Sequence, residues 1–240
     1  MTLRQGVVAG AITLEVSFAK DKPRAEPFEP TSIAPDIAVG VTDDLTIGLI
    51  NSSSALTGFR GSAGAGLCLT GTDGHCAHVY STGGLEALYS LAKGPAAIAA
   101  NAGFLLTSFT PEVHEDLKVG FKMKLSDGNV FALFSPSVWI ALDDRYARAV
   151  PHKDQIWAPI SLWVKTGKTA LGVGTGVKGP ITDFKDNWSV PIGLAAQYAL
   201  QPRASIGASF VFGKMLAGSG VPNPGADASA LQIWINVASN

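Results

Sequence analysis

The sequence predicts an all-β protein, a closed antiparallel up-and-down β-barrel of about twelve strands that spans a membrane. Three observations carry this prediction. Charged residues make up only 15% of the 240 residues, against about 25% in soluble proteins. Apolar residues alternate with small or polar ones over most of the chain, with the two-residue period of a β-strand. Short connections alternate with long ones, and both chain ends fall on the side of the short ones.

The clearest strand pattern covers residues 116–126. Odd-numbered residues from 117 to 125 are apolar, whereas the even-numbered ones are lysine or glycine. Asp127-Gly128 follows, a pair that tolerates the positive φ of a tight hairpin turn. The same reading predicts strands at 7–19, 35–42, 45–54, 80–93, 96–108, 116–126, 129–142, 155–166, 169–178, 188–200, 204–215 and 228–239.

Residues 85–102 are open to a second interpretation. They are good helix formers, and Leu85, Leu88, Tyr89 and Ala92 would also lie on one stripe of a helix. Gly94-Pro95 would separate two short helices as readily as it would turn a hairpin. The strand pattern of the rest of the chain favours two strands here.

The face opposite the apolar one is rich in Gly, Ala, Ser and Thr and carries few charges. A sheet face exposed to water is usually rich in Lys, Glu and Arg, whereas small residues leave room inside a cylinder. We therefore expect the apolar face to contact lipid and the small-residue face to line the lumen. Aromatic residues near strand ends could form girdles at the membrane interfaces: Phe18, Tyr89, Phe109, Trp157, Trp188, Tyr198 and Phe212.

The pattern of short turns, long loops and tilted strands of about ten residues resembles the bacterial outer-membrane β-barrel superfamily. The resemblance implies a single domain over residues 1–240, short periplasmic turns, long extracellular loops and contact with outer-membrane lipid, as a monomer or small oligomer. It also implies a mature form, because residues 1–5 lack the features of a signal peptide. The chain departs from the superfamily at its end, since Asn240 is not aromatic.

The polar residues on the small-residue face are the candidate pore lining. Lys118, Lys122, Lys124 and Lys165 outnumber Glu15 and Glu86, which predicts a weak preference for anions. Basic and acidic walls on opposite sides would set a field across the lumen; pairing of Lys with Glu inside the barrel is the alternative. The uncharged polar lining is predicted to be Asn101, Gln197, Gln232 and Asn236.

Cys68 and Cys76 flank a Gly-containing turn in the longest loop, a spacing typical of a disulfide in an oxidising compartment. His75 and His78 lie beside Cys76 and keep a metal site open as the weaker alternative. The spacing matches none of the zinc patterns with paired cysteines. We therefore expect the disulfide and no metal.

No motif in the sequence indicates catalysis or a cofactor. Residues 174–179 match G-x-G-x-x-G, but the match continues a strand alternation and Pro180 follows it, so a dinucleotide site is not expected. No serine, histidine and carboxylate fall together on neighbouring strands. The net charge of -1 leaves no basic excess for nucleic acid.

The leading hypothesis is a passive porin-like channel of the bacterial outer membrane for small solutes or ions. A second hypothesis is a plugged barrel that anchors displayed loops, with residues 55–79 and the Pro-rich stretch 21–35 available to an extracellular partner. A third is a soluble secreted β-barrel that binds a hydrophobic ligand. None of the three is an enzyme.

Overall fold

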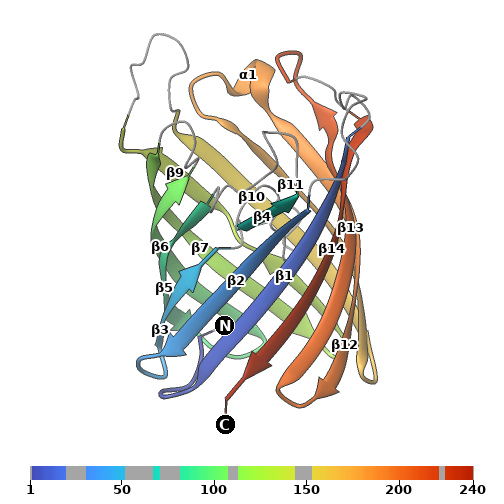
Figure 1. The fold of residues 1–240 in the computed structure, drawn as a ribbon. Helices are drawn as coiled ribbons and strands as arrows, with labels where there is room; N and C mark the ends of the chain where they lie inside the picture. Colours follow the sequence, from blue (N-terminus) through green and yellow to red (C-terminus); the bar gives the residue numbers. More distant parts are fainter. Residues whose placement is uncertain are drawn as a thin grey trace.

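The computed structural model describes residues 2–19, 31–51, 67–70, 82–107, 113–143, 153–221 and 225–239. Within these ranges one sheet curls into a barrel (Figure 1). The helix α1 (Phe184–Asn187) lies in the connection between β11 and β12. The strands are β1 (Val8–Ala19), β2 (Thr31–Gly40), β3 (Leu45–Ile50), β4 (Leu67–Thr70), β5 (Thr82–Ala92), β6 (Ala96–Thr107), β7 (His114–Asp127), β8 (Val130–Phe134), β9 (Ser137–Ala141), β10 (Gln155–Thr166), β11 (Thr169–Pro180), β12 (Ser189–Gln201), β13 (Ala204–Ala217) and β14 (Gly225–Ala238).

The barrel closes because β1 pairs with both β2 and β14. All neighbouring strands in the described part run antiparallel, and β8 and β9 share one place in the wall because both pair with β7 and β10. The short β4 pairs with the upper part of β2. Among the described residues the wall therefore has twelve strand positions, as the sequence predicts.

Both chain ends and the tight hairpins lie at one end of the barrel, which we call the turn end (Figure 1). Gly94, Gly128 and Gly167 adopt positive φ angles of 116°, 55° and 60° in three of these turns. Glycine reaches such angles without steric cost. These turns are the ones that the sequence predicts. The opposite end, with the long connections, is the loop end.

Residues 85–102 form strands and a hairpin, so the helical alternative is wrong. Leu45–Ile50 of β3 pairs with β5, and β5 pairs with β6 along nearly its whole length. These ladders satisfy the backbone groups of both strands and override the modest helix preference of their residues.

Two strands differ from the prediction because of proline. β2 begins at Thr31 and not at 35, so part of the expected loop 21–35 is strand, and Pro35 is paired opposite Ile12 within it. The predicted strand 129–142 is interrupted at Ser135 and Pro136. Proline has no N–H to donate to a ladder, yet the Pro136 carbonyl still accepts a hydrogen bond from Phe121 N at 3.1 Å.

Two further differences concern the long connections. Residues 67–70 form β4 inside the expected loop 55–79, a strand too short to show an alternation. β3 ends at Ile50, and residues 52–54 lie outside the described ranges. No helix in the described ranges is long and apolar enough to cross a bilayer.

The two faces of the wall are inverted relative to a soluble protein. Large apolar side chains are exposed on the outer face, including Ile12, Leu85 and Leu194 with 53%, 58% and 66% of their surface accessible. Polar side chains such as Thr13 and Glu15 are buried on the inner face. This is the surface of a barrel that spans a lipid bilayer.

Tyr89 and Tyr198 are exposed close to the turn end, as expected for a girdle. Trp157 is not part of one: it is buried inside the barrel. Phe109 lies outside the described residues.

Candidate functional site: the lumen

The lumen brings most of the predicted lining residues inside the barrel. Glu15, Glu86, Asn101, Lys118 and Gln232 are on the inner face and buried. Four more of the predicted residues are half-buried: Lys122, Lys124, Gln197 and Asn236. Lys165 is exposed, beside the tight turn that follows β10.

One charged cluster joins β5 to β7 across the strand between them. Glu86 accepts hydrogen bonds from Lys118 Nζ at 2.7 Å and from Lys122 Nζ at 2.6 Å. Gly103 of β6 stands in register between Glu86 and Lys118, and it presents no side chain to hold them apart. The expected acidic wall opposite the lysines is therefore wrong for Glu86, which is paired with the lysines on their own side.

A second polar ladder lies on the opposite wall, where β1, β14 and β13 meet. Glu15, Gln232 and Ser209 are aligned in register across the three strands. Gln232 Nε2 donates to Glu15 Oε2 at 2.8 Å, and Ser209 Oγ donates to Gln232 Oε1 at 2.6 Å. These bonds satisfy an amide and a carboxylate that would otherwise be costly to bury.

Four of the five tryptophans, all within the described ranges, also point inward. Trp163 and Trp234 belong to one cluster with Val211 and Ala195, whereas Trp139 and Trp157 belong to another with Leu105. These side chains thus project into the lumen from two parts of the wall, which narrows it there.

The sequence contains a second feature, besides the alternation, that indicates which tryptophans point inward. Each follows a Ser or Gln two positions earlier, on the same face of its strand. In three of the pairs the indole Nε1 donates to that residue: Trp139 to Ser137 Oγ at 3.1 Å, Trp157 to Gln155 Oε1 at 3.0 Å and Trp163 to Ser161 Oγ at 3.1 Å. Because the side chain two residues earlier accepts this hydrogen bond, the tryptophan can be buried without leaving its indole N–H unpaired.

Lysines lie over two of these rings. Lys118 Nζ is 5.6 Å from the centroid of Trp139, and Lys178 Nζ is 4.5 Å from that of Trp157. The two indoles are stacked with centroids 4.6 Å apart. The two tryptophans, the two lysines and Glu86 form a band around part of the inner wall. We call it the aromatic band: Glu86, Lys118, Trp139, Trp157 and Lys178. Lys178 of this band was missed from the sequence.

A chamber of about 330 Å³ opens toward the turn end between β1, β2 and β12–β14. Asp36, Gln197, Ser205 and Asn236 contribute its polar lining. Gln197 Nε2 and Asn236 Nδ2 both donate to Ser205 Oγ. The chamber is therefore lined mostly by small apolar residues, with one polar patch of amide and hydroxyl groups.

The predicted disulfide is not tested. Cys68 lies in β4, whereas Cys76, His75 and His78 lie outside the described residues. Within the described ranges, no group of three His, Cys, Asp or Glu side chains is arranged to hold a metal ion.

No family model and no curated protein matches the sequence. Among solved structures, the chain is similar to an outer-membrane channel of Pseudomonas putida F1, with a TM-score of 0.59 and 13% identity over 99% of this chain and 97% of that chain. It also matches an anion-selective porin of Comamonas acidovorans, with a TM-score of 0.45 and 9% identity over 97% of this chain and 99% of that one. OmpT, an outer membrane protein of Vibrio cholerae, matches with a TM-score of 0.41 and 13% identity over 97% of both chains. The likeness to the Pseudomonas channel shows a shared fold. Together with the apolar outer face, this fold is that of a β-barrel that spans a membrane.

Proposed function

We propose that the protein is a passive, porin-like channel of the bacterial outer membrane that admits small solutes or ions and weakly prefers anions. The observation that carries the proposal is the inverted wall, because an apolar exterior with a polar, charged interior provides a path for hydrophilic solutes. The fold shared with an outer-membrane channel supports the same function. The turn end would face the periplasm.

The anion preference rests on which inner charges are compensated. Lys178 joins the four predicted lysines on the inner face, and Asp36 and Asp116 join the two glutamates. Glu86 is engaged by two lysines. By contrast, Lys124 and Lys178 have no carboxylate partner among the described residues and contact aromatic rings. The surplus of available charge is therefore small and positive.

The lumen is a selective and narrow path in this proposal. The aromatic band and the Trp163–Trp234 cluster restrict its width. Asn101 and Thr13 place buried polar atoms there that have no hydrogen-bond partner among the described residues. Such atoms are satisfied by water or by a solute that passes.

The reversal potential of single channels in a planar bilayer under a KCl gradient tests the proposal. We expect current with a reversal potential of the sign for anion preference. Lys178→Gln should move that potential toward zero. Lys168→Gln, in an exposed tight turn, is the matched control and should leave it unchanged. Cation preference would contradict the selectivity, and absence of current would contradict the channel.

The buried inner residues also favour a second function, a plugged anchor. Glu15 and Trp234 are only 1% and 2% exposed, which is low for the wall of a wide aqueous pore. In this case residues 55–79, with a disulfide between Cys68 and Cys76, would bind an extracellular partner. Loss of partner binding on deletion of that loop, in a barrel that passes no current, would favour the anchor.

A further inference from the structure

The segment before β1 enters the barrel at the turn end. Leu3 N donates to Thr46 Oγ1 at 2.8 Å, and Thr46 is a buried side chain of the inner wall. The Arg4 carbonyl lies against the inner face of Gly40, so close that a Cβ on Gly40 would be 2.0 Å from the Arg4 oxygen. Residues 2–5 therefore lie inside the mouth of the barrel and not beside it.

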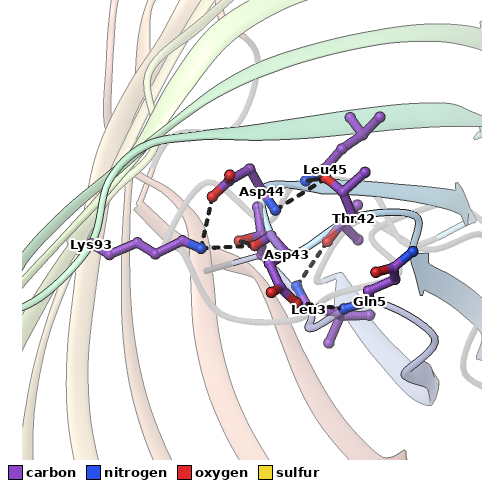
Figure 2. A network of polar contacts seen from close by, with 9 residues as sticks. Leu3, Gln5, Thr42, Asp43, Asp44, Leu45 and Lys93 are labelled. Atoms are coloured by element: carbon purple, nitrogen blue, oxygen red, sulfur yellow. Dashed lines mark hydrogen bonds and ion pairs between the residues drawn. The ribbon is translucent and has the colours of Figure 1, made fainter.

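The β2–β3 turn holds this segment in place (Figure 2). Gln5 N donates to Asp43 Oδ1 at 2.9 Å, and Thr2 Oγ1 donates to the Asp43 carbonyl at 3.1 Å. Lys93 binds the same turn, through the Asp43 carbonyl at 3.0 Å and Asp44 Oδ1 at 2.7 Å. Gly6, with a φ of 76°, then turns the chain into β1.

The segment and the wall border an open cavity of about 400 Å³ between residues 2–5 and strands β5–β7. Three cationic side chains line it against one carboxylate: Arg4, Lys93 and Lys124 against Asp43. The Asp43 carboxylate accepts a hydrogen bond from the Gln5 backbone amide, and Lys93 forms an ion pair with Asp44.

Arg4 and Lys124 have no carboxylate partner in the described part of the chain. Lys124 instead lies 5.1 Å from the centroid of the Phe131 ring. The other lining residues are small or hydroxyl-bearing: Thr2, Ser90, Ala92, Gly94 and Ala97. Arg4 and Lys124 thus line one small cavity together with hydroxyl-bearing side chains. A guanidinium, an ammonium and hydroxyls are the donors that suit a phosphate-type anion.

We propose that this cavity at the periplasmic mouth is a binding site for a small doubly charged oxyanion, held between Arg4 of the inserted segment and Lys124 of β7. Hydrogenphosphate is the simplest ligand of this class. The site deepens the proposed anion preference, because it would concentrate such anions where the lumen opens. It does not require that current flows, since it is an equilibrium site.

Calorimetric titration of inorganic phosphate into the full-length barrel in detergent, at low chloride, tests the proposal. Saturable binding to one site is expected. Arg4→Gln and Lys124→Gln should each weaken it about tenfold or more, the loss expected for one charge-assisted hydrogen bond. Lys165→Gln is the matched control, because Lys165 lies at the same end of the barrel but does not line the cavity.

No saturable binding by the unchanged protein would overturn the proposal. So would an equal loss in Lys165→Gln and Lys124→Gln, which would indicate general attraction to a basic rim. Arg4 is exposed and outside the strands, so Arg4→Gln decides the question if Lys124→Gln does not fold. Phosphate binding is measured at equilibrium without a membrane. If the barrel binds phosphate but passes no current, the result contradicts the proposed channel function and not the binding site.

Discussion

The indole of Trp234 lies flat against Gly207 on the neighbouring strand, and a methyl group at Gly207 would be 2.3 Å from Trp234 Cε2. Trp163 lies over Gly172 in the same way, with 2.6 Å to Cδ2. In both cases the two residues are in direct register. The space beside Gly207 and Gly172 is therefore filled by an indole ring. The small-residue pattern alone indicates free volume at these positions.

Gly207→Ala should force Trp234 out of its position. We expect a loss of about 1–3 kcal/mol in the free energy of unfolding, as for other overpacked cores, measured by urea unfolding in lipid vesicles. Gly213→Ala on the same strand is the control, because a Cβ there meets nothing within 4 Å. Equal stability of the two variants would contradict the packing.

Glu86→Gln should leave the ammonium groups of Lys118 and Lys122 without their carboxylate. The expected loss of stability is about 3–5 kcal/mol, because the Lys118 charge stays buried. In the bilayer the same variant should shift the reversal potential toward stronger anion preference. Glu115→Gln, at an exposed position of β7, is the control. Unchanged stability would show that the cluster is not a structural ion pair.

Trp157→Leu should widen the lumen at the aromatic band and raise single-channel conductance. It should also cost about 2–4 kcal/mol of stability, since part of a buried ring is lost. Leu194→Ala, which shortens an exposed side chain on the outer face, should leave conductance unchanged. If Trp157→Leu folds and conducts as before, the band does not limit the path.

Gly40→Ala should displace residues 2–5 from the mouth, because its Cβ would overlap the Arg4 carbonyl. Tryptic cleavage after Arg4 should become about tenfold faster or more, as expected when local opening costs about 1.4 kcal/mol less. Gly10→Ala is the control, since its Cβ meets only ordinary contacts at 3.7 Å and beyond. Equal cleavage rates in the two variants would place the segment outside the mouth.

Most strand positions and the tight turns could be predicted because period-two alternation and turn chemistry are local properties. Asp127-Gly128 is an example, where the pair alone specifies the hairpin. The pairing of Glu86 with Lys118 could not be predicted, because alternation fixes the face of a residue but not the register of three strands. Trp157 shares its face with Lys165, so alternation does predict an inward ring. The expectation of an interfacial girdle came from its place near a strand end and was wrong.

The hydrogen bond between Gln232 and Glu15 joins residues 217 positions apart, in the last and first strands. The Glu86 cluster, by contrast, joins strands that follow one another as hairpins. During assembly the cluster can form while the sheet is still open, whereas the Glu15 bond must wait for the two edges to meet, after the largest loop-closure entropy has been overcome. The hydrogen bond between Glu15 and Gln232 therefore joins the two strands that close the barrel, and it forms only when those strands pair.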